Sequence, residues 1–145
     1  MEGVVTRIEK AARYFERAAT DTLETAQLTH GELKVLLRLT RATRGQGDIA
    51  RSLLVSTGTM TNQLDKLERA GLVRRLPDPD DRRGKLVEMT PEGHERLNNY
   101  ISVQAKRETQ LLSHLTQTEK RQLLDLLRKC LASLDDESGP ALRPG

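Results

Sequence analysis

The sequence is poor in aromatic residues, in cysteine and in long apolar runs. It has no tryptophan, one phenylalanine and two tyrosines, so its core must be built mainly from aliphatic residues, which favours helices over a β-sandwich. The one cysteine, Cys130, cannot form an internal disulfide and agrees with a reducing compartment. No stretch approaches the roughly 18 consecutive apolar residues of a membrane span, and the first residues lack a signal-peptide pattern. We therefore expect a small helical protein in the cytoplasm, with no membrane partner.

The patterns that enzymes and metal sites use are also missing. There is no Gly-rich phosphate loop, nucleophile elbow or pair of carboxylates at catalytic spacing. The three histidines, His30, His94 and His114, have no neighbouring Cys, Asp or Glu at a metal-ligand spacing that stands out. We therefore expect no enzymatic activity, no cofactor and no metal. A net charge of +3 permits a nucleic-acid partner without requiring one.

Apolar periodicity and capping signals predict three helices in the first half of the chain. The first carries one apolar stripe between Val4 and Leu23. The second starts near His30, after a capping box of Thr29 and Glu32, and should turn inward Leu33, Leu36 and Leu37, with Thr40 as a further candidate. The third is short, with Asp48 as its cap and an apolar side of Ile49, Ala50, Leu53 and Leu54.

The second half begins with a helix that Ser56 caps and Gly71 ends, with a buried stripe of Met60, Leu64 and Leu67. Residues 72–76 and 85–89 follow as two strands of a hairpin. Thr90 and Pro91 start a long fifth helix. A capping box over 116–119 opens a sixth, whose apolar side holds Leu123, Leu127, Cys130, Leu131 and Leu134. We interpret Cys130 on this stripe as a buried structural residue, not a redox sensor.

A helix, a tight turn, a second helix and a hairpin with a basic tip form the order of a winged helix-turn-helix. The major groove of duplex DNA admits one helix, and a neighbouring hairpin can reach the backbone or the minor groove. Around the fourth helix, hydroxyl, amide and cationic side chains are expected to face outward, as the DNA-binding residues Ser56, Thr57, Thr59, Thr61, Asn62, Gln63 and Lys66. The alternative is an ordinary solvated helix face, but threonine and asparagine are poor helix formers, so their concentration favours function.

The hairpin tip between Pro77 and Lys85 mixes acidic and basic residues. Asp81 can pair with Arg82 or Arg83 and hold that guanidinium in one rotamer. A charged tip that serves only solubility is the alternative. In the first interpretation Arg82, Arg83 and Lys85 bind DNA, and Asp81 orients the wing.

Residues 49–93, IARSLLVSTGTMTNQLDKLERAGLVRRLPDPDDRRGKLVEMTPEG, resemble the MarR family, the multiple antibiotic resistance type of regulator. The specific part is LxxxGLVxRxxxxxDxRxxxLxLTxxG over 67–93, with Asp81 and Arg83 in the wing. The resemblance implies a homodimer held by the first, fifth and sixth helices, recognition helices in successive major grooves, and Arg83 in the minor groove. It also implies repression of a nearby gene and release from DNA by a small effector, such as an aromatic acid.

The predicted fold is mainly α with a small β-hairpin wing: a winged helix-turn-helix over 28–90, a helical dimerisation region over 1–27 and 91–137, and a flexible tail over 138–145. The predicted function is binding of a pseudo-palindromic operator as a regulator, and we expect a repressor. Lys34 and Arg38 are candidates for binding an anionic aromatic effector, and the candidate dimer residues are Ile8, Phe15, Leu123, Leu127 and Leu131. A winged-helix protein-interaction module without DNA binding is the alternative, and apolar anchors on the fourth helix would favour it.

Overall fold

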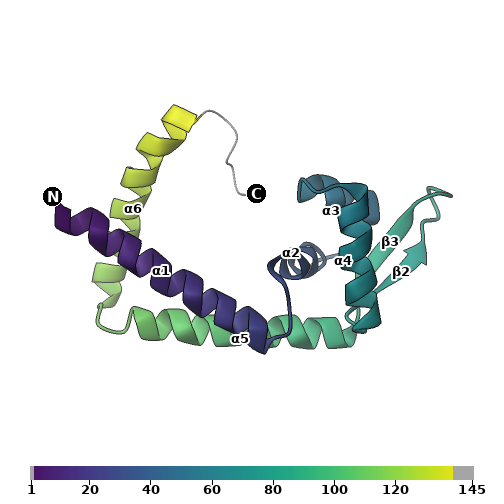
Figure 1. Cartoon of the computed structure of the whole chain (residues 1–145), viewed down its shortest axis with the longest axis horizontal. Helices are drawn as coiled ribbons and strands as arrows, with labels where there is room; N and C mark the ends of the chain where they lie inside the picture. The colour runs from purple at the N-terminus through teal and green to yellow at the C-terminus, as the bar shows by residue number, and fades with distance from the viewer. Residues whose placement is uncertain (1, 139–145) are drawn as a thin grey trace. The chain divides into compact units, whose positions relative to one another are not determined.

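The computed structural model describes residues 2–138 (Figure 1). They fall into two compact units divided between Lys106 and Arg107. The first unit holds α1 (Glu2–Thr25), α2 (His30–Arg38), α3 (Gln46–Ser52), α4 (Thr57–Arg69) and most of α5 (Pro91–Leu111). It also holds β1 (Arg44–Gly45), β2 (Val73–Pro77) and β3 (Lys85–Met89). The second contains the end of α5 and α6 (Gln117–Ser138). Apart from Ser138, the predicted tail lies outside the described residues, and the predicted division into regions stays a prediction.

The winged helix-turn-helix has its own core, which confirms the predicted fold class. The buried apolar side chains come from 28–97, with Val35, Leu36, Ile49, Met60 and Leu64 fully buried among them. The sheet has the order β1-β3-β2 and is antiparallel throughout. Burial of one leucine side chain contributes about 1.5–3 kcal/mol, and this core is shared by α2, α3, α4 and the sheet.

Capping signals placed most helix starts correctly. Thr29 and Glu32 form the predicted capping box of α2, with bonds of 3.1 and 3.0 Å. Ser56 caps α4, and Gly71 follows that helix at a φ of 75°, where glycine has no steric penalty. The box that opens α6 is also present, since Thr116 and Glu119 exchange hydrogen bonds. Both predicted strands of the hairpin are confirmed to within one residue.

The start of α3 was predicted wrongly. Arg44 and Gly45 pair with Val87 and Leu86 of β3, so the predicted two-stranded hairpin is part of a three-stranded sheet. This pairing keeps Gly45 extended, with a φ of −62° and a ψ of 137°, so Gly45 becomes the N-cap and Asp48 lies inside the first turn. A two-residue strand has no periodicity of its own, which is why the sequence did not reveal it.

Several residues predicted to face inward do not. Leu37 is 41% exposed, and Thr40 is exposed beyond the end of α2, whereas Val35 is fully buried. Leu54 is 93% exposed and has a φ of 54°, in the left-handed region. It lies in the turn between α3 and α4, where its neighbours Leu53 and Val55 pack against the core.

The end helices bury little of their apolar surface within the chain. Val4, Val5 and Ile8 of α1 are exposed, as are several leucines of α6. Cys130 is exposed too, so its predicted burial does not occur within one chain. No helix among the described residues has the length and apolar character needed to cross a membrane.

Candidate nucleic-acid interface

Helix α4 has one buried face and one exposed polar face. Met60, Leu64 and Leu67 recur at four- and three-residue steps and are buried in the core, which fixes the rotation of the helix. The opposite face is left to solvent, and its exposed side chains include Thr57, Thr59, Asn62 and Lys66. Ser56 accepts a hydrogen bond from the Thr59 amide at 3.1 Å and so completes the first turn. Hydroxyl, amide and ammonium groups of this kind can contact phosphates and base edges.

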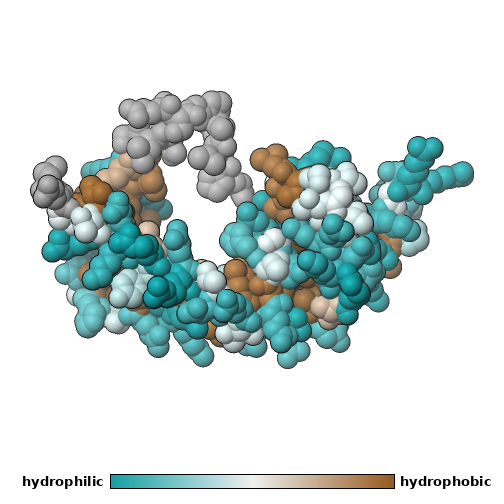
Figure 2. Space-filling view, in the orientation of Figure 1, coloured by the Kyte–Doolittle hydropathy of each residue, from teal (hydrophilic) through white to brown (hydrophobic). Residues whose placement is uncertain are grey.

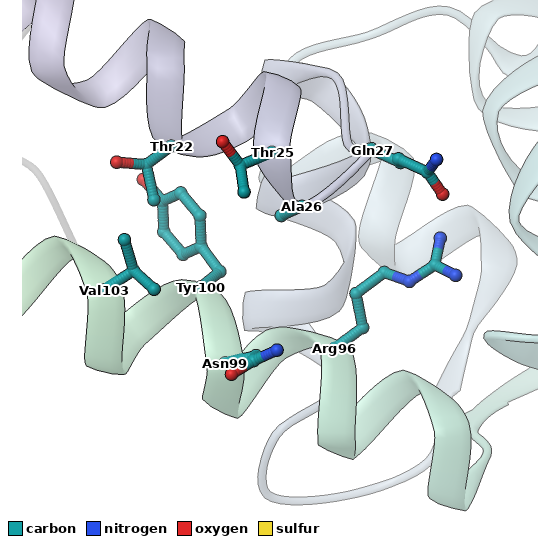
Figure 3. Close-up of a pocket in the computed structure, with 8 residues that line it drawn as sticks. All are labelled: Thr22, Thr25, Ala26, Gln27, Arg96, Asn99, Tyr100 and Val103. Carbon is teal, nitrogen blue, oxygen red and sulfur yellow. The ribbon is translucent and has the colours of Figure 1, made fainter.

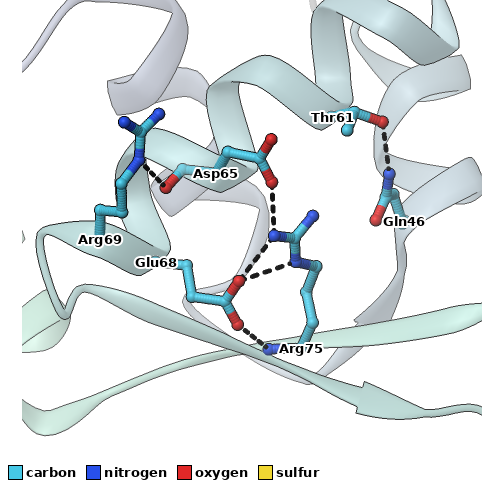
Figure 4. Close-up of polar contacts among 6 residues, drawn as sticks. All are labelled: Gln46, Thr61, Asp65, Glu68, Arg69 and Arg75. Carbon is cyan, nitrogen blue, oxygen red and sulfur yellow. Dashed lines mark hydrogen bonds and ion pairs between the residues drawn. The ribbon is translucent and has the colours of Figure 1, made fainter.

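Two residues predicted to face outward are engaged inside the protein. Thr61 is half-buried and accepts a hydrogen bond from Nε2 of Gln46 in α3, at 3.1 Å (Figure 4). Gln63 lies against Gly31 of α2, because a Cβ added to that glycine would overlap Nε2 of Gln63. Gln63 stands three residues after Met60 and four before Leu67, so helical spacing places it next to the buried stripe. That spacing was visible in the sequence and is the signal that the prediction missed.

The wing is a regular hairpin with a tight charged tip. Strands β2 and β3 pair from Val73 opposite Met89 to Pro77 opposite Lys85. Beyond them, the Asp80 amide donates to Asp78 at 2.9 Å, and the Gly84 amide donates to the Asp81 carbonyl at 3.0 Å. The tip presents the exposed cations Arg82, Arg83 and Lys85, and the end of the wing is hydrophilic (Figure 2).

Asp81 acts on the backbone of the tip. Its carboxylate accepts a hydrogen bond from the Arg83 amide at 3.0 Å, and the structure shows no Asp81–Arg83 ion pair among the described residues. The predicted pairing of the two side chains is therefore replaced by a turn that orients the residue through its main chain. Gly84 is part of the same turn, because a Cβ there would come within 2.9 Å of the Asp81 carboxylate.

An ion-pair cluster joins α4 to the wing (Figure 4). Arg75 of β2 donates through Nη2 to Asp65 and Glu68 of α4, and through Nε to Glu68 at 3.0 Å. Its backbone amide also donates to Glu68, at 3.3 Å. The hydrogen bond from the Arg75 side chain lowers the pKa of Glu68. The same bond raises the pKa of Arg75. This cluster was not predicted, since its members lie seven and ten residues apart and come from different elements.

Comparisons with known proteins agree with this geometry. A family model described as MarR family matches residues 28–85. An uncharacterized HTH-type transcriptional regulator of Bacillus subtilis, YkoM, is 33% identical over 123 residues, which cover 81% of this chain and 79% of that relative. The chain belongs to the MarR family.

Another curated relative and a solved structure have similar levels of sequence identity and coverage. The HTH-type transcriptional regulator PecS of Dickeya dadantii is 29% identical over 130 residues, covering 86% of this chain and 77% of PecS. The crystal structure of an S. aureus MepR–DNA complex has a TM-score of 0.74 and 28% identity, covering 88% of this chain and 96% of that one. This MarR-family chain is therefore a transcriptional regulator with the winged-helix fold of DNA-binding relatives.

A pocket of about 160 Å³ lies in the first unit between the end of α1 and the middle of α5 (Figure 3). It is lined by Thr22, Thr25, Ala26, Gln27, Arg96, Asn99, Tyr100 and Val103. The ring of Tyr100 reaches toward Thr22, and the guanidinium of Arg96 points toward Gln27. Gln27 itself has a φ of 54°, so the connection to α2 is constrained where it borders the pocket.

The residues predicted to bind an effector do not line this pocket. Lys34 is exposed on α2, and Nε of Arg38 donates to Oγ of Ser52 in α3 at 3.4 Å. The pocket's cation is Arg96, which the sequence could not single out because α1 and α5 are far apart in the chain.

The candidate dimer residues are mostly exposed in a single chain. Ile8, Leu123 and Leu131 have exposed fractions of 44, 38 and 56%, whereas Phe15 and Leu127 are half-buried. Exposed leucines repeated along one helix are unusual for a protein that acts alone, because large apolar patches mark interaction surfaces.

Proposed function

We propose that the protein binds a pseudo-palindromic operator as a homodimer and represses transcription in the cytoplasm until a small effector releases it. One observation carries the DNA-binding part: the exposed polar face of α4 stands next to a wing with three exposed cations, and Arg75 joins the two. A helix and a hairpin joined in this way can enter a major groove and the minor groove beside it at the same time. The polar character of α4 argues against a module that binds protein through apolar anchors.

In this proposal the exposed residues of α4 contact base edges and phosphates, whereas the wing reaches the minor groove. Narrow A·T-rich minor grooves have a strong negative potential that favours an inserted guanidinium. We assign Arg83 to the minor groove. Arg82 and Lys85 are assigned to contacts with the neighbouring phosphates. Thr61 and Gln63 are removed from the direct contacts, because both are engaged within the protein.

Selection of bound duplexes from a random DNA pool tests the proposal first. We expect a palindrome with A·T-rich positions flanking each half-site. Arg83→Ala should then weaken binding to the selected duplex by about 1–3 kcal/mol per subunit and relax the preference at those positions. Lys66→Ala should instead weaken selected and scrambled duplexes alike. Unchanged affinity of Arg83→Ala would leave recognition to α4 alone.

The homodimer is proposed because α1 and α6 leave apolar side chains exposed. Leu131→Asp should therefore shift the protein toward monomer in sedimentation at micromolar concentration. Gln122→Asp is the matched control, since it adds the same charge on the opposite face of α6 and is already exposed. A wild-type protein that sediments as a stable monomer would contradict the dimer.

The effector is proposed to be a small anionic aromatic molecule in the pocket between α1 and α5. Arg96 supplies the charge, and Tyr100 supplies a ring face with a polar end. A ligand changes DNA affinity only through its different affinities for the two states. Aromatic acids should consequently weaken operator binding of the wild type but not of Arg96→Gln. If no such acid changes DNA affinity or thermal stability, the effector proposal fails.

A further inference from the structure

Two arginines beside the helix-turn-helix are held in place through their Nε atoms. Nε of Arg44, in β1, donates to the carbonyl oxygen of Arg38 at the end of α2, at 2.9 Å. Nε of Arg38 donates to Oγ of Ser52 at the end of α3, at 3.4 Å. The two side chains thus form a short chain of hydrogen bonds that links α2, β1 and α3.

The Nη groups of both arginines are left for another partner. Among the described residues, neither guanidinium forms an ion pair with a carboxylate, whereas Arg51, Arg74 and Arg75 each do. Arg44 is exposed and Arg38 half-buried. A guanidinium fixed through Nε presents its two Nη groups as a planar fork, the geometry that matches two oxygens of a phosphate.

The position of this arginine pair relates it to the recognition helix. Gln46, two residues after Arg44, donates a hydrogen bond to Thr61 in α4. Ser52, the partner of Arg38, stands four residues before the N-cap of α4. In Figure 1, α2 and α3 lie on one side of α4 and the β2–β3 hairpin lies on the other. A helix in the major groove has a phosphate backbone along each side, and the wing serves only one of them.

We propose that Arg38 and Arg44 form a phosphate-binding pair that holds the DNA backbone on the α2–α3 side of the recognition helix. The exposed Arg41 adds positive charge in the same segment. This inference rests on the proposed function and adds a second backbone-binding site to it. It gives Arg38 a role in DNA binding in place of the effector role predicted from sequence. Because a phosphate is the same at every base pair, the pair contributes affinity and no sequence preference.

The test uses Arg38→Gln, Arg44→Gln and the double variant of the full chain, with the selected duplex and a scrambled duplex of the same length. Each single variant should bind both duplexes about 3- to 10-fold more weakly near 150 mM salt. The slope of log affinity against log salt should fall by about one unit for each phosphate that the variant no longer neutralises. The preferred sequence should not change.

Arg51→Gln is the matched control, because it removes the same charge from α3 but that charge is already paired with Asp48. Equal effects of Arg51→Gln and Arg44→Gln would mean a general charge effect and would overturn the proposal. The proposal would also be overturned if the double variant kept the wild-type salt slope, or if it lost affinity for the selected duplex alone. A lowered melting temperature with an unchanged salt slope would mean that the two arginines only stabilise the end of α2, and would also overturn the proposal. If the wild type binds no duplex, the proposed function itself fails, whereas wild-type binding with an unaffected double variant rejects only the arginine pair.

Discussion

We call the exposed face of α4 and the wing together the reading surface. Arg75 offers the sharpest test of how this surface is held together. Its side chain is 22% exposed and donates to Asp65 and Glu68, whose side chains are 41 and 39% exposed. Fully exposed ion pairs contribute about 0–1 kcal/mol, and breaking a buried pair costs about 3–5 kcal/mol. The Arg75 cluster lies between these limits. We expect Arg75→Ala to lower the free energy of unfolding by about 2 kcal/mol, since two neighbouring carboxylates lose their common partner but can still be hydrated.

Arg74 is the matched control for this change. It is the adjacent residue on β2 and pairs with Glu88, but its side chain is 66% exposed. Arg74→Ala should cost less than about 1 kcal/mol. Both variants should be unfolded with urea at pH 7 and at one protein concentration, because the stability of a dimer depends on concentration. If Arg75→Ala loses no more stability than Arg74→Ala, the cluster does not join α4 to the wing.

Acid should weaken the same cluster. The pKa of Glu68 is lowered in the folded protein from its ordinary value of 4.5, chiefly by the Arg75 side chain. A carboxylate whose pKa is lower in the folded state contributes stability that is complete above its unfolded pKa and is lost as the pH falls through the folded value. The stability difference between wild type and Glu68→Gln should therefore be constant near neutral pH and should shrink below pH 4.5. A difference that persists unchanged at lower pH would contradict this account.

Two further substitutions test the backbone. Leu54→Gly should raise the free energy of unfolding by about 0.5–1 kcal/mol, because glycine relieves the left-handed conformation and the side chain is almost fully exposed. Leu54→Ala is its control and should stay within about 0.5 kcal/mol of wild type in urea unfolding. Gly93→Ala should destabilise by about 2–3 kcal/mol, since its Cβ would overlap the Leu72 carbonyl oxygen. An unchanged melting curve for Gly93→Ala would refute that steric argument.

Local signals account for most of what the sequence predicted correctly. Capping boxes at Thr29 and Thr116 and the stripe of α4 are short-range patterns, and the backbone follows them. The wing strands were bounded by Gly71, which readily adopts the positive φ that ends α4, and by Pro91, whose ring fixes φ for the start of α5. The fold class followed from the order of these elements.

The features that the sequence did not reveal depend on residues distant in the chain. Strand β1 exists because β3 pairs with it, and Gly45 rather than Asp48 then precedes α3. The outward face of α4 was assigned by residue type, so Gln63 was counted as a DNA-binding residue although it packs against α2. The cation of the pocket between α1 and α5 is Arg96, which only the folded chain brings beside Gln27.

These long-range interactions have a common effect on the reading surface. Arg75 joins α4 to the wing, Gln46 joins α3 to α4, and β1 joins the sheet to the start of α3. We therefore expect α4 and the wing to keep a fixed position relative to each other. An effector bound between α1 and α5 touches none of these three contacts. We therefore expect it to change the distance between the two reading surfaces of the proposed dimer and not the shape of either surface. It should then weaken binding to a palindrome much more than binding to a single half-site, and equal weakening of both would mean that the effector distorts the reading surface itself.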